Sequence, residues 1–378
     1  MMQEQILFSC PCKANILGEQ LEHNGGVILA IDLGINFNVA LKESKESYMQ
    51  FIFPNRTFSI AIKEMKYHNM AEYDWKLEDL KETEIAVWWI INELKERKII
   101  IERGFKAIYN FDIDSCEKNN TLIPFQILTL RAISKLNGYD IPLRDVEIIN
   151  ESIQRKMARD FRGDCENIIL NRLDEGKIHI LHCNSLKYES EYMDFQRYSF
   201  ILSFNRNWSL DEVESLRRKQ CQQALERLQK VVNISCLCNI SLNEFEKFKG
   251  IIIDEEVLEV ATYVVYENQR VKEAIKMLQQ RNLKALGEAM KDSHRALRSQ
   301  YKMVDEKQQW ISERAASMEG CLGSKSTRTT FGVGNLTLIE NSAIDKFKDA
   351  LAKAYKDRFN EEIEFYLMST CFNIPSQC

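Results

Sequence analysis

The segment of residues 11–26 holds the side chains of this sequence that are best suited to bind a polar ligand. Lys13 supplies a cation, Glu19 and Glu22 supply carboxylates, and Gln20 supplies an amide. A carboxylate accepts hydrogen bonds, whereas an amide both accepts and donates them. The segment ends in an Asn-Gly-Gly turn signal. Because a carboxylate can also brace such a turn, Glu19 has a structural interpretation beside the binding one.

The 11 cysteines of the chain could ligate a metal or remain free thiols. Cys10/Cys12 and Cys236/Cys238 form C-x-C pairs, and neither is followed by a second pair at metal-ligand spacing. The odd total and the lack of a signal-peptide pattern argue against a disulfide framework. We therefore expect buried free thiols, with a zinc site as the alternative.

Composition limits the function classes that this chain can serve. It has 378 residues, 45% of them hydrophobic and 28% charged, with a formal net charge of -5. These values are typical of a soluble globular protein and offer no basic surface to nucleic acid or to an anionic membrane. No run of about 18 apolar residues is present, as a membrane-spanning helix would require. We expect a cytoplasmic protein that binds neither nucleic acid nor membrane.

The elements that must position the polar residues follow from periodicity and turn signals. We expect strands at 5–10, 26–42, 107–111, 177–182 and 199–204, with helices at 77–97 and 123–136. From residue 209 the pattern is mostly helical, at 210–231, 242–248, 254–279 and 283–301. The chain ends in a strand, a helix and a strand at 336–340, 342–359 and 363–367. This order predicts an α+β protein of two lobes, residues 1–195 and 196–378.

Residues 11–26, PCKANILGEQLEHNGG, resemble the galactokinase signature P-G-R-V-N-L-I-G-E-H-T-D-Y-N-G-G without a gap. Six further segments resemble galactokinases in the same order, so the likeness covers nearly the whole chain: 88–113, 163–187, 216–221, 262–274, 293–301 and 327–340. The resemblance implies the fold of the GHMP kinases. In that fold an N-terminal lobe with a mixed sheet and a C-terminal α+β lobe have the site between them.

The phosphate loop of the family, P-x-G-x-G-L-S-S-S-A, aligns with residues 114–124, which contain no glycine. Glycines let backbone N–H groups turn inward around a phosphate at a helix N-terminus. Asp114 and Glu117 instead add negative charge, and two unit charges about 4 Å apart interact by roughly 4 kcal/mol at an intermediate dielectric. The resemblance leaves as nucleotide contacts Lys118, Asn120 and Thr121. Thr121 could replace a magnesium-binding serine, and Lys118 has a solvated loop position as its alternative.

A second glycine-rich turn of the family, T-G-G-G-F-G-G, aligns with residues 327–333, which read Thr-Arg-Thr-Thr-Phe-Gly-Val. Side chains therefore stand where the family's backbone approaches the ligand. Gly332 remains, either as a nucleotide contact or as a residue that the turn itself requires.

The resemblance places Glu166 at the position of the catalytic aspartate and Lys13 at that of its partner arginine. Both replacements keep the sign of the charge, but glutamate is longer and lysine lacks the planar fork that grips phosphate oxygens. A displacement of about 1 Å can cost on the order of a hundredfold in rate. Asp164 is a substitute carboxylate. The alternative is that Glu166 and Lys13 form an ion pair with a structural role.

The resemblance assigns sugar hydroxyls to Glu19, Gln20 and Glu22, whereas a tyrosine of the family is replaced by Glu214. We therefore expect a sugar pocket with an altered preference. Glu267, Asn268 and His294 match family positions that shape the fold, and His294 is expected to be a packed, hydrogen-bonded helix residue.

Two functions remain open after this comparison. The first is an ATP-dependent sugar 1-kinase that uses Mg-ATP to phosphorylate galactose or a related sugar. The second is a degenerate galactokinase that binds a sugar, or a protein partner, without turnover. The altered phosphate loop favours impaired or lost catalysis.

Overall fold

The computed structural model describes residues 5–54, 56–62, 82–99, 101, 103–111, 122–157, 162–192, 197–205 and 211–368. The chain divides into two compact units. One comprises Met1–Cys12 and Ile35–Arg172, and the other comprises Lys13–Gly34 and Leu173–Cys378. The lobes predicted from the sequence, with a boundary near residue 195, are a different division and stay a prediction.

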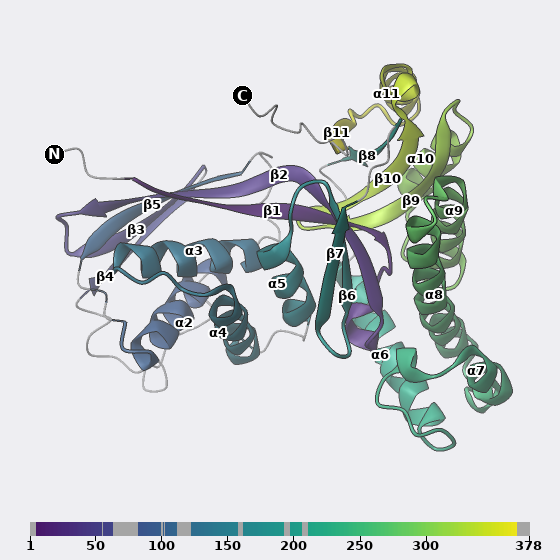
Figure 1. Cartoon of the computed structure of the whole chain (residues 1–378), viewed down its shortest axis with the longest axis horizontal. Helices are drawn as coiled ribbons and strands as arrows, with labels where there is room; N and C mark the ends of the chain where they lie inside the picture. Colours follow the sequence, from purple (N-terminus) through teal and green to yellow (C-terminus); the bar gives the residue numbers. More distant parts are fainter. Residues whose placement is uncertain are drawn as a thin grey trace. The chain divides into compact units, whose positions relative to one another are not determined.

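The first unit is a sheet covered by helices (Figure 1). Its strands are β3 (Tyr48–Phe53), β4 (Arg56–Ala61), β5 (Gly104–Phe111) and parts of β1 (Ile6–Leu17) and β2 (Val27–Ser44). β5 pairs antiparallel with β2 and parallel with β3, and β4 pairs antiparallel with β3. The helices are α2 (Glu82–Glu96), α3 (Leu122–Leu136), α4 (Leu143–Lys156) and α5 (Arg162–Arg172). Tyr109 of β5 packs on Phe125 of α3 with ring centroids 5.0 Å apart, which joins sheet and helix in one apolar core.

The second unit carries an antiparallel sheet and most of the helices. The strand order β11-β8-β10-β9-β1 is built from β8 (Tyr198–Phe204), β9 (Cys321–Thr329), β10 (Gly332–Glu340) and β11 (Glu364–Met368). The start of β2 pairs with β6 (Lys177–His182), which pairs with β7 (Lys187–Tyr192). The helices are α6 (Asp211–Leu228), α7 (Leu242–Phe248), α8 (Glu255–Gln279), α9 (Leu283–Ser299), α10 (Glu306–Ala316) and α11 (Ile344–Phe359). The protein is therefore an α+β protein, as the sequence predicts.

Helix α9 lies directly against β9 because two glycines face each other (Figure 1). A Cβ atom on Gly323 would lie 2.2 Å from the carbonyl oxygen of Gly287, so no side chain fits at this crossing. The backbone N–H of Ser326 donates to Nδ1 of His294 at 3.1 Å, and Nε2 of His294 lies 3.0 Å from Oε1 of Gln309. Burial lowers the pKa of His294 to about 4. His294 is thus the packed, hydrogen-bonded residue that the sequence predicts, and it fixes the position of β9.

Helix α8 holds the connection between β1 and β2. Oε1 of Glu267 accepts a hydrogen bond from the backbone N–H of Gly18 at 3.0 Å, and Oδ1 of Asn268 accepts one from that of Val27 at 3.1 Å. Gly18 has φ of +92°, and a Cβ atom there would lie 2.5 Å from the carbonyl oxygen of Val27. These contacts confirm that Glu267 and Asn268 shape the fold around residues 18–27.

The cysteines of the described ranges are free thiols: Cys10, Cys12, Cys165, Cys183, Cys221, Cys236, Cys238 and Cys321. Among the same residues, no three side chains of histidine, cysteine, aspartate or glutamate are placed to hold a metal ion. None of the helices described is both long and apolar enough to cross a lipid bilayer.

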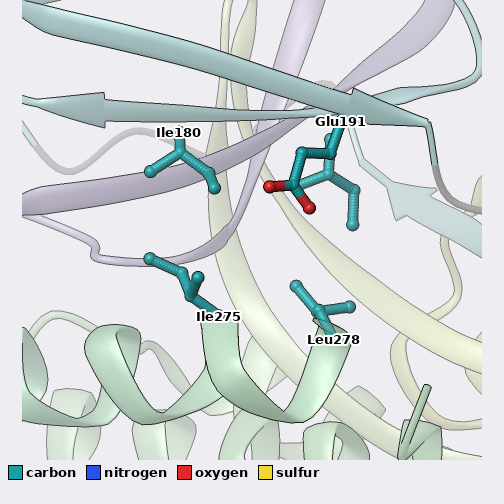
Figure 2. A pocket seen from close by; sticks show the side chains of 5 residues that line it. Ile180, Glu191, Ile275 and Leu278 are labelled. Carbon is teal, nitrogen blue, oxygen red and sulfur yellow. The ribbon is translucent and has the colours of Figure 1, made fainter. Parts of the chain in front are cut away.

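A small cavity lies where β6 and β7 face α8 (Figure 2). Four aliphatic side chains and one carboxylate line it: Ile178, Ile180, Ile275, Leu278 and Glu191. None of the site residues predicted from the sequence belongs to its lining, so the candidate site is elsewhere in this unit.

Candidate functional site

The carboxylate of Glu19 is the centre of a buried polar network in the second unit. Glu19 follows β1 in a turn, and its side chain is 3% exposed. Its Oε1 accepts hydrogen bonds from Nζ of Lys325 at 2.9 Å, from Oγ1 of Thr327 at 2.9 Å and from the backbone N–H of Arg328 at 3.2 Å. All three donors come from β9, which lies beside β1 with Ala14 opposite Thr329.

Asn15 links Glu19 to Lys13, the predicted catalytic lysine. Nζ of Lys13 donates to Oδ1 of Asn15 at 2.9 Å, and Nδ2 of Asn15 donates to Oε2 of Glu19 at 3.4 Å. The backbone N–H of Lys13 donates to Oγ1 of Thr330 at 2.8 Å, which holds the lysine against the end of β9. All four side chains are buried. One amide therefore connects the lysine assigned to catalysis with the carboxylate assigned to the sugar.

Gln20 and Glu22 complete the set of predicted sugar ligands. Gln20 has a left-handed backbone with φ of +65°, and its carbonyl oxygen accepts from Nδ2 of Asn24 at 3.0 Å. Its buried side-chain Oε1 has no hydrogen-bond partner among the described residues. Burial raises the pKa of Glu22, and the positive charge of Lys13 opposes that rise. The turn thus presents an amide oxygen, which would accept a hydrogen bond, beside a carboxyl group.

Arg328 and Glu214 form an ion pair close to this turn. Nη1 of Arg328 donates to Oε2 of Glu214 at 2.5 Å, and Arg218 lies 3.6 Å from the other oxygen of Glu214. Glu214 is on α6 and its side chain is 1% exposed. In the alignment with galactokinases, Glu214 replaces a tyrosine and Arg328 replaces a glycine. The two residues that differ from the galactokinase pattern, Arg328 and Glu214, therefore form an ion pair with each other.

Gly332 begins β10 directly after the tight turn from β9. Oγ1 of Thr329 donates to the carbonyl oxygen of Gly332 at 3.0 Å. The φ of Gly332 is +151°, which side chains rarely adopt. This backbone angle favours the interpretation that the turn requires Gly332, while a nucleotide contact there stays a prediction.

The other predicted catalytic and nucleotide residues lie in the first unit or outside the described residues. Glu166 is on α5 of the first unit and is partly buried, so its pairing with Lys13 of the second unit stays a prediction. The predicted nucleotide contacts lie outside the described residues: Lys118, Asn120 and Thr121.

Sequence reasoning missed Lys325 and Arg328 as members of the site. A signal was present, because β9 carries two cations within the run Ser-Lys-Ser-Thr-Arg, which has no apolar residue. A lysine in such a strand needs an anionic partner if it is buried.

His23, next to Glu22, gives this site a pH dependence. Burial, together with the positive charges of Arg218 and Arg328, lowers the pKa of His23 to about 3. Between pH 6.5 and 3 the unfolded chain therefore binds a proton at His23 that the folded chain does not. Stability rises with pH in that window, by about 1.4 kcal/mol per pH unit for one such group.

We expect His23→Gln to make the loss of stability on acidification less steep. Burial also lowers the pKa of His179 and of His294 to about 4, so the slope that the histidines contribute between pH 4.5 and 6 should fall by about one third rather than vanish. Burial raises the pKa of Asp32 to about 6, which opposes this slope equally in both proteins. Glu22 has the opposite effect on the pH dependence of stability, because the unfolded chain loses the proton of this carboxyl group at a lower pH than the folded chain does. The substitution His23→Gln leaves Glu22 in place, so this contribution is the same in both proteins. Urea unfolding of both proteins from pH 4.5 to 7 measures the difference, and parallel curves would contradict the assignment to His23.

Comparison with known proteins shows which proteins this chain resembles. No protein-family model matches the chain. The galactokinase of Clostridium perfringens is 27% identical over 374 residues, which cover 96% of this chain and 93% of that protein. A structure of Lactococcus lactis galactokinase complexed with galactose has a TM-score of 0.81 at 21% identity, covering 96% of this chain and 93% of that one. Methanococcus jannaschii mevalonate kinase has a TM-score of 0.64 at 15% identity, with 97% and 98% covered.

The sequence likeness to the galactokinase of Clostridium perfringens covers 96% of the chain. The expected fold is confirmed by the solved structures. The chain is a homologue of the galactokinases and has the fold of the GHMP kinases.

Proposed function

We propose that this galactokinase-like protein binds galactose or a related sugar, and that its phosphotransfer from Mg-ATP is impaired or lost. The observation that carries the sugar part is the buried carboxylate of Glu19, which β9 and Asn15 hold in one orientation. The similar Lactococcus lactis galactokinase was solved with galactose, which supports a sugar as the ligand.

The predicted ligands suit hydroxyl groups. Glu19 and Glu22 would accept hydrogen bonds from a sugar, and the buried Oε1 of Gln20 would accept another. A buried polar atom left without a partner is costly, so a site of this kind discriminates against ligands that lack the matching hydroxyl. The ion pair of Arg328 and Glu214 occupies two positions that differ from the galactokinase pattern, which supports a preference different from that of galactokinases.

Two features support weakened phosphotransfer. Mg-ATP would be the cofactor of any remaining activity, with Lys118, Asn120, Thr121 and Gly332 as its predicted contacts and Thr121 beside the metal. The second glycine-rich turn does not fit a nucleotide well, because Oγ1 of Thr329 and Oγ1 of Thr330 are engaged by the chain itself. The missing glycines of residues 114–124 act in the same direction.

The chain's own catalytic groups would work less well than those of a galactokinase. Glu166 would take the proton from the attacking hydroxyl, and Lys13 would stabilise the charge that develops. Nζ of Lys13 already donates one hydrogen bond to Asn15, and a lysine cannot grip two phosphate oxygens with a planar fork. Any remaining turnover should therefore be slow.

Thermal unfolding with galactose, with Mg-ATP and with both tests this proposal. A ligand that binds only the folded chain stabilises it by about 2.7 kcal/mol at a concentration of 100 times its Kd. We expect the melting temperature to rise with galactose and to stay unchanged with Mg-ATP. A rise with Mg-ATP alone, or rapid formation of sugar phosphate, would contradict the loss of catalysis. No response to any sugar in a panel of hexoses would contradict sugar binding.

We further propose that the protein acts in the cytoplasm. The free cysteines of the described residues support a reducing compartment, where thiols persist. Fractionation of cells that produce the protein measures this directly, and recovery from an oxidising compartment would contradict it.

A further inference from the structure

Lys325 is a fully buried lysine whose partner is a predicted sugar ligand. Its side chain is 0% exposed in β9, and its Nζ lies 2.9 Å from Oε1 of Glu19, which is 3% exposed. Removing two charges from water is expensive, and an apolar pair of similar volume is often as stable or more stable. Stability alone therefore does not account for a lysine at this position.

The two oxygens of the Glu19 carboxylate have different surroundings. Oε1 receives Nζ of Lys325 and the backbone N–H of Arg328, both of which can donate at all times. Thr327 has one hydroxyl proton, which it shares between Oε1 at 2.9 Å and the carbonyl oxygen of Asn15 at 2.7 Å. Oε2 receives a hydrogen bond of 3.4 Å from Nδ2 of Asn15. Because a carboxylate oxygen accepts two bonds readily, Oε2 keeps capacity for a ligand hydroxyl.

We propose that Lys325 is a positioning residue of the sugar site, which fixes Oε1 of Glu19 so that Oε2 faces the hydroxyl of the sugar. The proposal rests on the proposed sugar binding by Glu19. Lys325 acts through Glu19 and does not touch the ligand itself. A charged donor is suited to this task, because hydrogen bonds between ions are shorter and stronger than those between neutral groups.

The positioning role differs from a merely structural one in two measurable ways. If Lys325 acts only through Glu19, its substitution should matter little once Glu19 is no longer a carboxylate. If the position of a charge is what counts, Lys325→Arg should retain most of the function that Lys325→Met loses. A general loss of stability predicts neither result.

The test measures the galactose dissociation constant by calorimetry for four variants and the wild type. We expect Lys325→Met to weaken binding by about 30-fold and Lys325→Arg to stay within about threefold of the wild type. In the Glu19→Gln background, adding Lys325→Met should change affinity by less than about twofold. An equal effect of Lys325→Met in both backgrounds, or unchanged affinity in a folded Lys325→Met protein, would overturn the proposal.

Two further measurements test the proposal if Lys325→Met does not fold or if the wild type binds no sugar. If Lys325→Met does not fold, Lys325→Gln retains an amide donor toward Oε1 and takes its place in the comparison. If the wild type binds no sugar, the proposed function fails, and crystal structures of the wild type and the variant then decide the positioning claim. A Glu19 carboxylate that turns away from Arg328 and Thr327 in the variant supports the role of Lys325, and one that keeps its place overturns it.

Discussion

Glu267→Leu is expected to lower the free energy of unfolding by about 3–5 kcal/mol, because it removes the acceptor of several buried donors at once. Glu267 is 0% exposed on α8. Its Oε1 accepts from the backbone N–H of Gly18 at 3.0 Å and from Oγ of Ser293 at 2.7 Å, and its Oε2 pairs with Arg270. Leucine would leave all three donors without this partner.

Urea unfolding measures the loss, with Glu273→Leu as the matched control. Glu273 is an exposed residue of the same helix, where it accepts a hydrogen bond from Gln269, and its substitution should stay within about 0.5 kcal/mol of the wild type. Equal midpoints for the two variants would show that the contact with Gly18 contributes nothing.

The same substitution should also abolish sugar binding. Gly18 precedes Glu19, so the hydrogen bond that the backbone N–H of Gly18 donates to Glu267 fixes the backbone that carries the predicted sugar ligands. A folded Glu267→Leu protein that binds galactose as tightly as the wild type would show that Glu267 stabilises the fold but is not needed to position the sugar ligands.

Much of the fold could be predicted because periodic apolar patterns decide it. The helix expected at 254–279 is α8 (Glu255–Gln279), and the expected final strand, helix and strand correspond to β10, α11 and β11. One of the missed elements, β7, lacks such a pattern. The sequence of β7, KYESEY, is polar, and it is a strand because it pairs with β6.

Strand β9 was missed for a different reason. Its residues 323–327 are all buried, yet most are small and polar and one is a lysine. Their burial is compensated by partners far away in the sequence: Ser324 bonds Thr337, the N–H of Ser326 bonds His294, and Lys325 bonds Glu19. Hydrophobic patterning cannot detect a strand whose burial depends on long-range hydrogen bonds.

The residues of the candidate site could likewise be predicted from the sequence only in part. The motif of residues 11–26 could be aligned with a known signature, so Lys13 and Glu19 were found from the sequence. The residues that orient them were not, because Lys325 is 306 positions from Glu19 and is brought to it by the pairing of β1 with β9. Local spacing carries no information about such a pair.

Arg328→Leu is expected to destabilise the chain by about 2–4 kcal/mol, because it removes a cation that lies 2.5 Å from the buried carboxylate of Glu214. Arg218, 3.6 Å from that carboxylate, should compensate part of the loss. Glu214→Tyr alone should cost a similar amount, since it leaves the guanidinium of Arg328 without this partner. Both values come from urea unfolding of the single variants.

The double variant Arg328→Gly/Glu214→Tyr restores both residues of the galactokinase pattern. We expect it to be more stable than the single substitutions Arg328→Gly and Glu214→Tyr, each measured alone, would predict by addition. A coupling of about 1–3 kcal/mol is typical of residues in contact, while a glycine within a strand costs roughly 0.5–1 kcal/mol. Strict additivity would mean that the two departures are independent of each other.

If the ion pair sets the altered sugar preference, the double variant should also bind galactose at least about tenfold more tightly, which corresponds to 1.4 kcal/mol. It should gain no response to Mg-ATP, because residues 114–124 still lack glycine. Tighter sugar binding without nucleotide binding would separate two independent changes from the galactokinase pattern, one in the sugar pocket and one in the phosphate loop. A nucleotide response in the double variant would instead show that Arg328 itself blocks the nucleotide, and that the phosphate loop is competent without its glycines.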